Sequence, residues 1–115
     1  MKSLGQLVKQ LREQEGWPQR KLAYELDVDV SVLSKIENDN RFPKKRVSEI
    51  LKTVSRLFGV SEKDLRECYF SDEIASILVY EEDISSILKV SEAKVKYARA
   101  NNIKQSEIQF KDASN

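Results

Sequence analysis

Five side chains in one short segment have chemistry suited to recognition, because they offer hydrogen-bond groups and apolar surface but no strong nucleophile. Over residues 30–38, Leu33 and Ile36 have the spacing of one buried helical stripe. The residues on the outer face of this predicted helix are Val30, Ser31, Ser34, Lys35 and Asn38. In the major groove of DNA, a lysine can reach guanine O6 and N7, a serine can donate or accept, and a valine can contact a thymine methyl. The segment therefore predicts contact with base pairs of double-stranded DNA.

Reactive chemistry has little support in the composition. The 115 residues contain no histidine and a single cysteine, Cys68. Zinc sites and histidine-based general-base catalysis are therefore largely excluded, and no disulfide can form within the chain. The sequence also has no glycine-rich phosphate loop. We expect no enzymatic activity, no cofactor and no metal site, and we expect Cys68 to be a small core residue.

Two short helices joined by a tight turn are predicted to position the outer face. A small residue is needed where two such helices approach each other, and Ala23 supplies it. The apolar residues that close the inside corner are Leu22, Leu26, Val28, Leu33 and Ile36. We expect Asp29 at the N-cap of the second helix, where its carboxylate can accept backbone N–H groups. The segment from Gln19 to Asn38 is thus predicted to be a helix-turn-helix.

Helical periodicity continues through most of the chain, with no alternating strand pattern. A first helix starts near Leu4 and ends near Gly16, and a fourth runs from Val47 to the helix-ending Gly59. The segment 61–64 resembles a capping box that opens a fifth helix. Helical patterns return from Ser71 to about Tyr80 and from about Asp83 to Ala100, whereas Phe42 and Pro43 are expected in a loop.

The motif Q-x-x-L-A-x-x-L-x-V-x-x-S-x-L-S-K-I-E-N, which begins at Gln19, resembles the Cro/CI-type (XRE) helix-turn-helix family of bacterial and phage repressors. The resemblance runs from about Leu4 to Leu65. It implies an all-α fold, a lambda-repressor-like five-helix domain with a C-terminal helical extension. We expect the helix-turn-helix domain over residues 1–70, the extension over 71–101 and a disordered tail over 102–115.

The resemblance also implies roles for individual residues. Gln19 would contact a phosphate and brace the recognition helix. The residues that match base-reading positions, or lie beside them, are Val30, Ser31, Ser34 and Lys35. The residues that match positions along the DNA backbone are Asn38, Asn40 and Arg41. Arg12 and Glu37 match a pair that forms a salt bridge between the first and third helices in related phage repressors.

Three residues depart from the family pattern. Asp27 stands where the family usually has glycine in the turn, and Asp39 stands where glycine often follows the third helix. Pro18 replaces the usual capping serine or threonine before Gln19, although proline is tolerated in a first helical turn. We expect the fold to accommodate all three, and Asp39 to place negative charge near the DNA.

Charge is divided unevenly along the chain. The net charge is +1, but residues 1–60 hold 12 Lys/Arg against 8 Asp/Glu, and residues 61–115 hold 8 against 11. A cluster of basic residues follows the motif and contains a single acid, Glu49. Its members are Arg41, Lys44, Lys45, Arg46, Lys52 and Arg56. This cluster lies where DNA phosphates would pass.

The C-terminal part has a short heptad seam, formed by Ile84, Leu88, Ser91, Val95 and Ala98. The two helices over 71–101 either fold back on their own domain or form the interface of a homodimer, with exchange of helices more plausible than a pure coiled coil. We favour the homodimer, because one recognition helix covers about half a site. The overall interpretation is a cytoplasmic repressor that binds double-stranded DNA, with no membrane segment. The alternatives are an antitoxin whose C-terminal helices mask a toxin, and a protein-interaction adaptor that has lost DNA binding.

Overall fold

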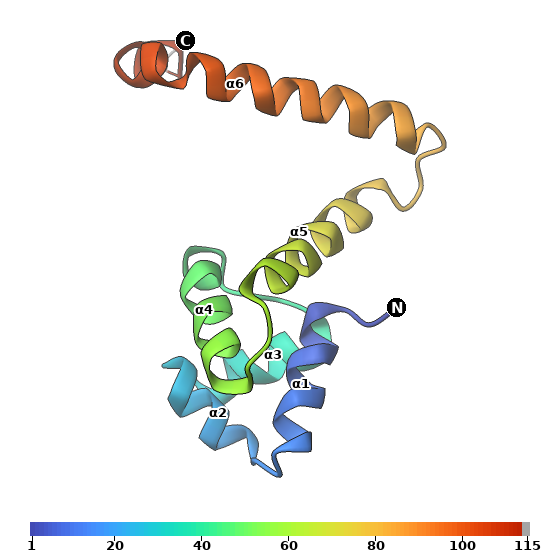
Figure 1. Ribbon diagram of the computed structural model, residues 1–115, viewed down its shortest axis with the longest axis vertical. Helices are drawn as coiled ribbons and strands as arrows, with labels where there is room; N and C mark the ends of the chain where they lie inside the picture. Colours follow the sequence, from blue (N-terminus) through green and yellow to red (C-terminus); the bar gives the residue numbers. More distant parts are fainter. Residues whose placement is uncertain (114–115) are drawn as a thin grey trace. The chain divides into compact units, whose positions relative to one another are not determined.

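All regular elements in the part of the chain that the structure describes are helices, as the sequence predicted. The computed structural model describes the backbone of residues 1–113 and the side chains of residues 1–102. In chain order (Figure 1), the elements are α1 (Leu4–Gln14), α2 (Gln19–Leu26), α3 (Val30–Asp39), the 3-10 helix η1 (Lys44–Arg46), α4 (Val47–Phe58), α5 (Glu62–Leu78) and α6 (Ile84–Ala113). The chain divides into two compact units, Met1–Ile77 and the part that begins at Leu78. The first unit holds the helix-turn-helix, formed by α2 and α3.

The core of the first unit contains the residues that the inside-corner pattern selected. Leu22, Ala23, Leu26, Leu33 and Ile36 are buried, and Val28 packs against them from a half-buried position. The helix α3 contacts both α1 and α2. Apolar burial of this kind is the main favourable contribution to folding, about 1.5–3 kcal/mol for each large side chain. The recognition helix is therefore held on two sides.

Helix ends follow the local sequence, with two corrections. Asp29 is the N-cap of α3, but its side chain makes no capping hydrogen bond, contrary to our expectation. The positive φ after α3 belongs to Asn40, at 54°, whereas Asp39 is the last helical residue. Asp27 has a φ of 55°, a left-handed conformation that Asp tolerates better than most residues. Gly59 ends α4 at a φ of 65°, as predicted.

The segment after residue 60 differs from the sequence interpretation. The helix α5 is continuous from Glu62 to Leu78, so the chain has no break near Ser71, and the boundary between the compact units falls after Ile77. Ser61 accepts a hydrogen bond from the Asp64 backbone N–H (3.2 Å), one half of the expected capping box. The backbone of α6 is helical to Ala113. This differs from the expected end near Ala100 and from the disordered tail over 102–115, of which residues 114–115 lie outside the described part.

Aromatic residues complete the core, and one of them, Phe42, belongs to the segment that was predicted as a loop. Phe42 is buried, and its ring lies 5.6 Å from that of Tyr69 in an edge-on arrangement. The ring of Trp17 lies 5.4 Å from that of Phe58, and both residues pack against the buried core. Cys68 is half-buried against the same core, and this burial raises the pKa of its thiol.

The close approach of α1 to α3 requires a glycine at position 5. A Cβ at Gly5 would collide with the carbonyl oxygen of Ile36, a backbone atom that cannot move alone. We therefore expect Gly5→Ala to lower the free energy of unfolding by about 1–3 kcal/mol, measured by urea denaturation. Glu13→Ala, at an exposed position of the same helix, is the control and should change it by less than about 0.5 kcal/mol. Equal stability of the two variants would contradict this packing.

Candidate nucleic-acid interface

The outward face of α3 carries the side chains that the sequence predicted to read bases. Val30 is 45% exposed, and Ser31, Lys35 and Asn38 are exposed as well. Ser34 is half-buried, and its hydroxyl oxygen accepts a hydrogen bond from Asn38 Nδ2 (3.1 Å). The helical wheel leaves Val30 and Val32 equivalent, but in the structure Val32 packs against the core and Val30 does not. This face therefore combines an apolar end, two hydroxyls, an amide and one amine.

A buried ion pair holds α3 from behind. Arg12 of α1 donates through Nε to Glu37 Oε2 (2.7 Å) and through Nη2 to Glu37 Oε1 (2.9 Å), which is the pair that the family resemblance implied. Arg12 is 8% exposed and Glu37 is 3% exposed. The hydrogen bond with Glu37 raises the pKa of the Arg12 guanidinium, although burial acts in the opposite direction. Arg12 Nη1 also donates to the backbone oxygen of Trp17 (2.7 Å).

Gln19 adds a third helix to this contact. Its Nε2 donates to Glu37 Oε1 (3.0 Å), and its side chain is half-buried at the start of α2. The carboxylate of Glu37 thus accepts hydrogen bonds from both α1 and α2. Gln19 therefore contacts α3 directly, and the phosphate contact that the resemblance implied for it stays a prediction.

Asn40, predicted to follow the DNA backbone, is the C-cap of α3, and its side chain makes hydrogen bonds within the domain. Its Oδ1 accepts from the backbone N–H of Gly5 (2.8 Å), and its Nδ2 donates to Asp72 Oδ2 (3.1 Å). The amide therefore holds α1 and α5 at the end of α3, a role that sequence reasoning missed. Arg41, the next residue, is exposed and free to extend from this end of the recognition helix.

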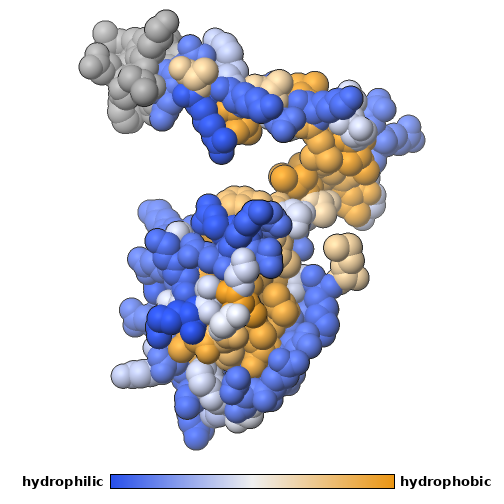
Figure 2. Space-filling view, in the orientation of Figure 1, coloured by the Kyte–Doolittle hydropathy of each residue, from blue (hydrophilic) through white to orange (hydrophobic). Residues whose placement is uncertain are grey.

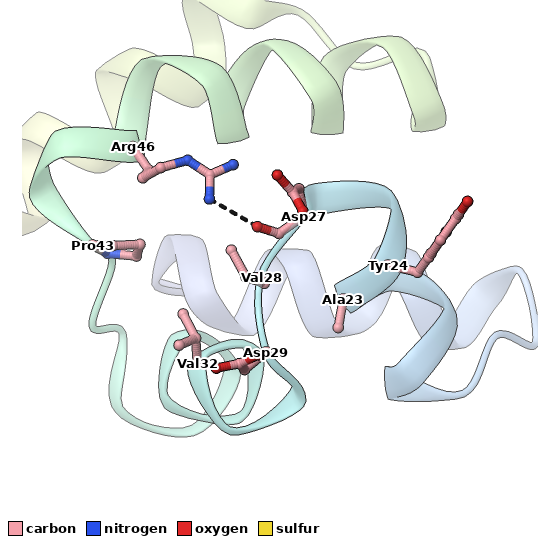
Figure 3. A pocket seen from close by; sticks show the side chains of 8 residues that line it. All are labelled: Ala23, Tyr24, Asp27, Val28, Asp29, Val32, Pro43 and Arg46. Atoms are coloured by element: carbon pink, nitrogen blue, oxygen red, sulfur yellow. Dashed lines mark hydrogen bonds between the residues drawn. The ribbon is translucent and has the colours of Figure 1, made fainter.

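Arg46 holds the turn between α2 and α3. Its Nη1 donates to the Asp27 backbone oxygen (2.8 Å), as Figure 3 shows, and its Nη2 donates to the Leu26 backbone oxygen (3.0 Å). In the sequence Arg46 is one member of a basic cluster, and nothing in the residue pattern distinguishes it as a residue that holds the turn. Beside these contacts lies a pocket of about 470 Å³, whose lining includes Ala23, Val28 and Val32. The other basic residues of the cluster are exposed: Arg41, Lys44, Lys45, Lys52 and Arg56.

The described residues were also compared with the requirements of a metal site and of a membrane span. No group of three Cys, Asp or Glu residues is arranged there to hold a metal ion. None of the described helices combines the length and apolar character needed to span a bilayer.

The fold and the outer face of α3 define a helix-turn-helix protein. The sequence profile described as a helix-turn-helix domain matches residues 5–67, more than half of the chain. The chain belongs to this helix-turn-helix domain family, which indicates a DNA-binding regulator. Neither the curated proteins nor the solved structures include a significant match.

Removal of one partner of the buried ion pair should strongly destabilise the first unit. Glu37→Ala leaves the Arg12 charge buried without its partner, so we expect a loss of about 3–5 kcal/mol in the free energy of unfolding, measured by urea denaturation. The double variant Arg12→Met/Glu37→Leu removes both charges and should recover most of that loss.

The control for this cycle is the pair of Arg46 and Glu49 (3.0 Å between Nε and Oε2), in which the carboxylate is exposed to solvent. Glu49→Ala should cost about 0–1 kcal/mol, since solvent screens an exposed pair. A similar cost for Glu37→Ala and Glu49→Ala would show that the buried pair does not fix α3.

Proposed function

We propose that the chain is a sequence-specific binder of double-stranded DNA of the Cro/CI (XRE) type and acts as a transcriptional repressor. The observation that carries the proposal is the two-sided character of α3. Its inner side is locked by the Arg12–Glu37 pair, and its outer side offers hydrogen-bonding side chains to solvent. A rigid helix with such a face fits the major groove, where each base pair has its own pattern of donors and acceptors.

In this proposal the contacts divide by chemistry. The side chains that would meet base edges or lie beside them are Val30, Ser31, Ser34 and Lys35. Those that would contact phosphates are Gln19, Asn38 and Arg41, with support from the exposed basic residues that follow α3. Asn40 is not among them, because its amide is bonded within the domain. Occupation of an operator by this surface would exclude polymerase and requires no covalent chemistry.

We further propose that the protein acts as a homodimer on paired half-sites, assembled through residues 71–101. Ten of the thirteen exposed large hydrophobic residues of the described chain lie between Phe70 and Tyr97. Within the seam, Ile84, Leu88 and Val95 are 44%, 42% and 48% exposed. Figure 2 shows orange surface on both the end of α5 and α6. Exposed apolar surface of this extent marks an interaction site, and a C₂ dimer matches a palindromic pair of half-sites.

The direct test of DNA recognition is random-sequence selection with the purified protein, followed by titrations on the selected duplex. Lys35→Ala should weaken binding to that duplex by about 1–3 kcal/mol if the amine contacts a base, and should weaken binding to random DNA much less. Fluorescence anisotropy measures both affinities. Lys63→Ala is the matched control, because it removes an exposed lysine from α5, outside the motif.

Two outcomes of these titrations would count against the proposal. Equal weakening on selected and random DNA would assign Lys35 to the DNA backbone alone. For a DNA binder, the logarithm of affinity should fall with the logarithm of salt concentration by about 0.9 for each phosphate contacted. A flat salt profile and no selected sequence would favour a protein-interaction adaptor, with which the exposed acids Asp27, Asp29 and Asp39 agree.

The homodimer has its own test in the seam. Leu88→Lys places a charge within the apolar stripe and should convert the dimer to a monomer at micromolar concentration, as measured by sedimentation equilibrium. Ala93→Lys adds the same charge on α6 outside the stripe and should leave the dimer intact. If the unmodified chain sediments as a monomer, the two helices fold back on their own domain instead.

A further inference from the structure

Asp72 is a carboxylate on α5 that connects to the start of α1 and to the end of the recognition helix. Its Oδ2 accepts from the backbone N–H of Leu4 (2.8 Å) and from Nδ2 of Asn40 (3.1 Å). The Cys68 thiol lies 4.0 Å from the same oxygen, one helical turn earlier on α5. Both stronger hydrogen bonds come to a single oxygen, from elements that are 68 and 32 residues away along the chain.

Asn40 connects Asp72 to the end of α3. It is the left-handed C-cap of that helix, and its backbone N–H donates to the Ile36 oxygen (3.1 Å). Its Oδ1 accepts from Gly5 N–H (2.8 Å), so the amide is held from both sides. The backbone of Asn40 has a φ of 54°, which is restricted for a residue other than glycine. An independent movement of α5 would therefore break the hydrogen bonds of the amide rather than carry Asn40 with it. The last turn of α3 is therefore tied to Asp72.

The remaining contacts of α5 are apolar and carry less directional information. Leu65 and Tyr69 bury themselves in the core on the same side of α5 as Asp72. Hydrophobic contacts are nearly independent of angle, whereas hydrogen bonds weaken steeply away from linear geometry. Asp72 thus adds angular and axial restraint to the attachment of α5.

The opposite side of α5 is apolar and exposed. Three apolar residues lie across the helix from Asp72, because a helix turns by about 100° per residue. They are Phe70, two residues before Asp72, Ile74, two residues after it, and Ile77, five residues after it. Their exposed fractions are 48%, 43% and 74%. A helix that is apolar on both sides is normally covered on both. In the proposed homodimer, this stripe of α5 forms one part of the interface. Asp72 lies on the same helix, on its other side.

We propose that Asp72 is a positioning residue that fixes the recognition helix relative to α5, so that it sets which spacing of two half-sites the homodimer accepts. This inference rests on the proposed function, because spacing has meaning only for a dimer on DNA. With the hydrogen bonds to Leu4 and Asn40 in place, α5 and the last turn of α3 keep a fixed relative position. Without them, α3 still faces outward, since Arg12 and Glu37 hold it, but its position relative to the dimer interface loosens.

The test compares affinities on three duplexes: the selected operator, the same half-sites moved one base pair apart, and one half-site alone. The unmodified protein should prefer the selected spacing by about tenfold or more, as expected when half-site separation is set by rigid geometry. Asp72→Ala should reduce this preference to about twofold, while affinity for one half-site and the dimer mass change little. Asp72→Asn should restore the preference, because one amide oxygen can accept both hydrogen bonds.

Glu67→Ala is the matched control, since it removes an exposed carboxylate from the same helix, one that lies 3.9 Å from the Lys63 amine. It should keep the wild-type preference. If Asp72→Ala does not fold, Asp72→Glu serves instead: it keeps the charge, moves the acceptor by one methylene and should also weaken the spacing preference.

Each remaining outcome counts against the inference. Equal losses on all three duplexes would make Asp72 a residue of general stability, and an unchanged preference would remove its positioning role. Binding by the unmodified protein without any spacing preference would overturn this inference and leave DNA recognition standing. No binding to any duplex would overturn the proposed function as well, so the two failures are distinguishable.

Discussion

The placement of the recognition helix depends on the buried carboxylate of Glu37. This one group accepts hydrogen bonds from Arg12 of α1 and Gln19 of α2, so three helices meet at two oxygen atoms. Among the described residues, no buried side-chain nitrogen or oxygen lacks a partner, which is the condition under which a buried charge is tolerated. Because Glu37 must face inward, the rotation of α3 about its own axis is fixed. Lys35, two residues earlier, must then face outward.

The backbone corner between α2 and α3 is held by a second arginine. Asp27 adopts the left-handed conformation that glycine accepts most easily, and the carbonyl oxygens of Leu26 and Asp27 end α2. Arg46 donates to both oxygens and also pairs with Glu49. Thus the corner is joined to the start of α4. This arrangement explains how a chain without glycine in the turn keeps the geometry of the motif.

The sequence predicted the helices and the inside corner well, because both follow from the spacing of apolar residues along a single helix. It also pointed to the outer face of α3 and, through the family resemblance, to the pair of Arg12 and Glu37. It did not reveal the role of Asn40, because its partners Gly5 and Asp72 are 35 and 32 residues away. Arg46 was missed for a similar reason, since an arginine that caps distant carbonyls looks the same in sequence as one that faces solvent. The length of α5 was missed because its apolar residues lie on two faces, which weakens the helical period.

In the proposed homodimer, the two faces of α5 would connect DNA recognition with assembly. In the first unit, the exposed large hydrophobic residues before Phe70 are few, namely Met1, Tyr24 and Val30, and Val30 belongs to the recognition face itself. From Phe70 onward, apolar residues reach the surface repeatedly, on the same helix whose inner side holds Leu65, Tyr69 and Asp72. A partner that covers the outer stripe of α5 would therefore press on an element bonded directly to the last turn of α3. Because folded interiors are closely packed and transmit strain, a displacement of that stripe in the proposed homodimer would be passed to α3 while the hydrogen bonds of Asp72 are intact.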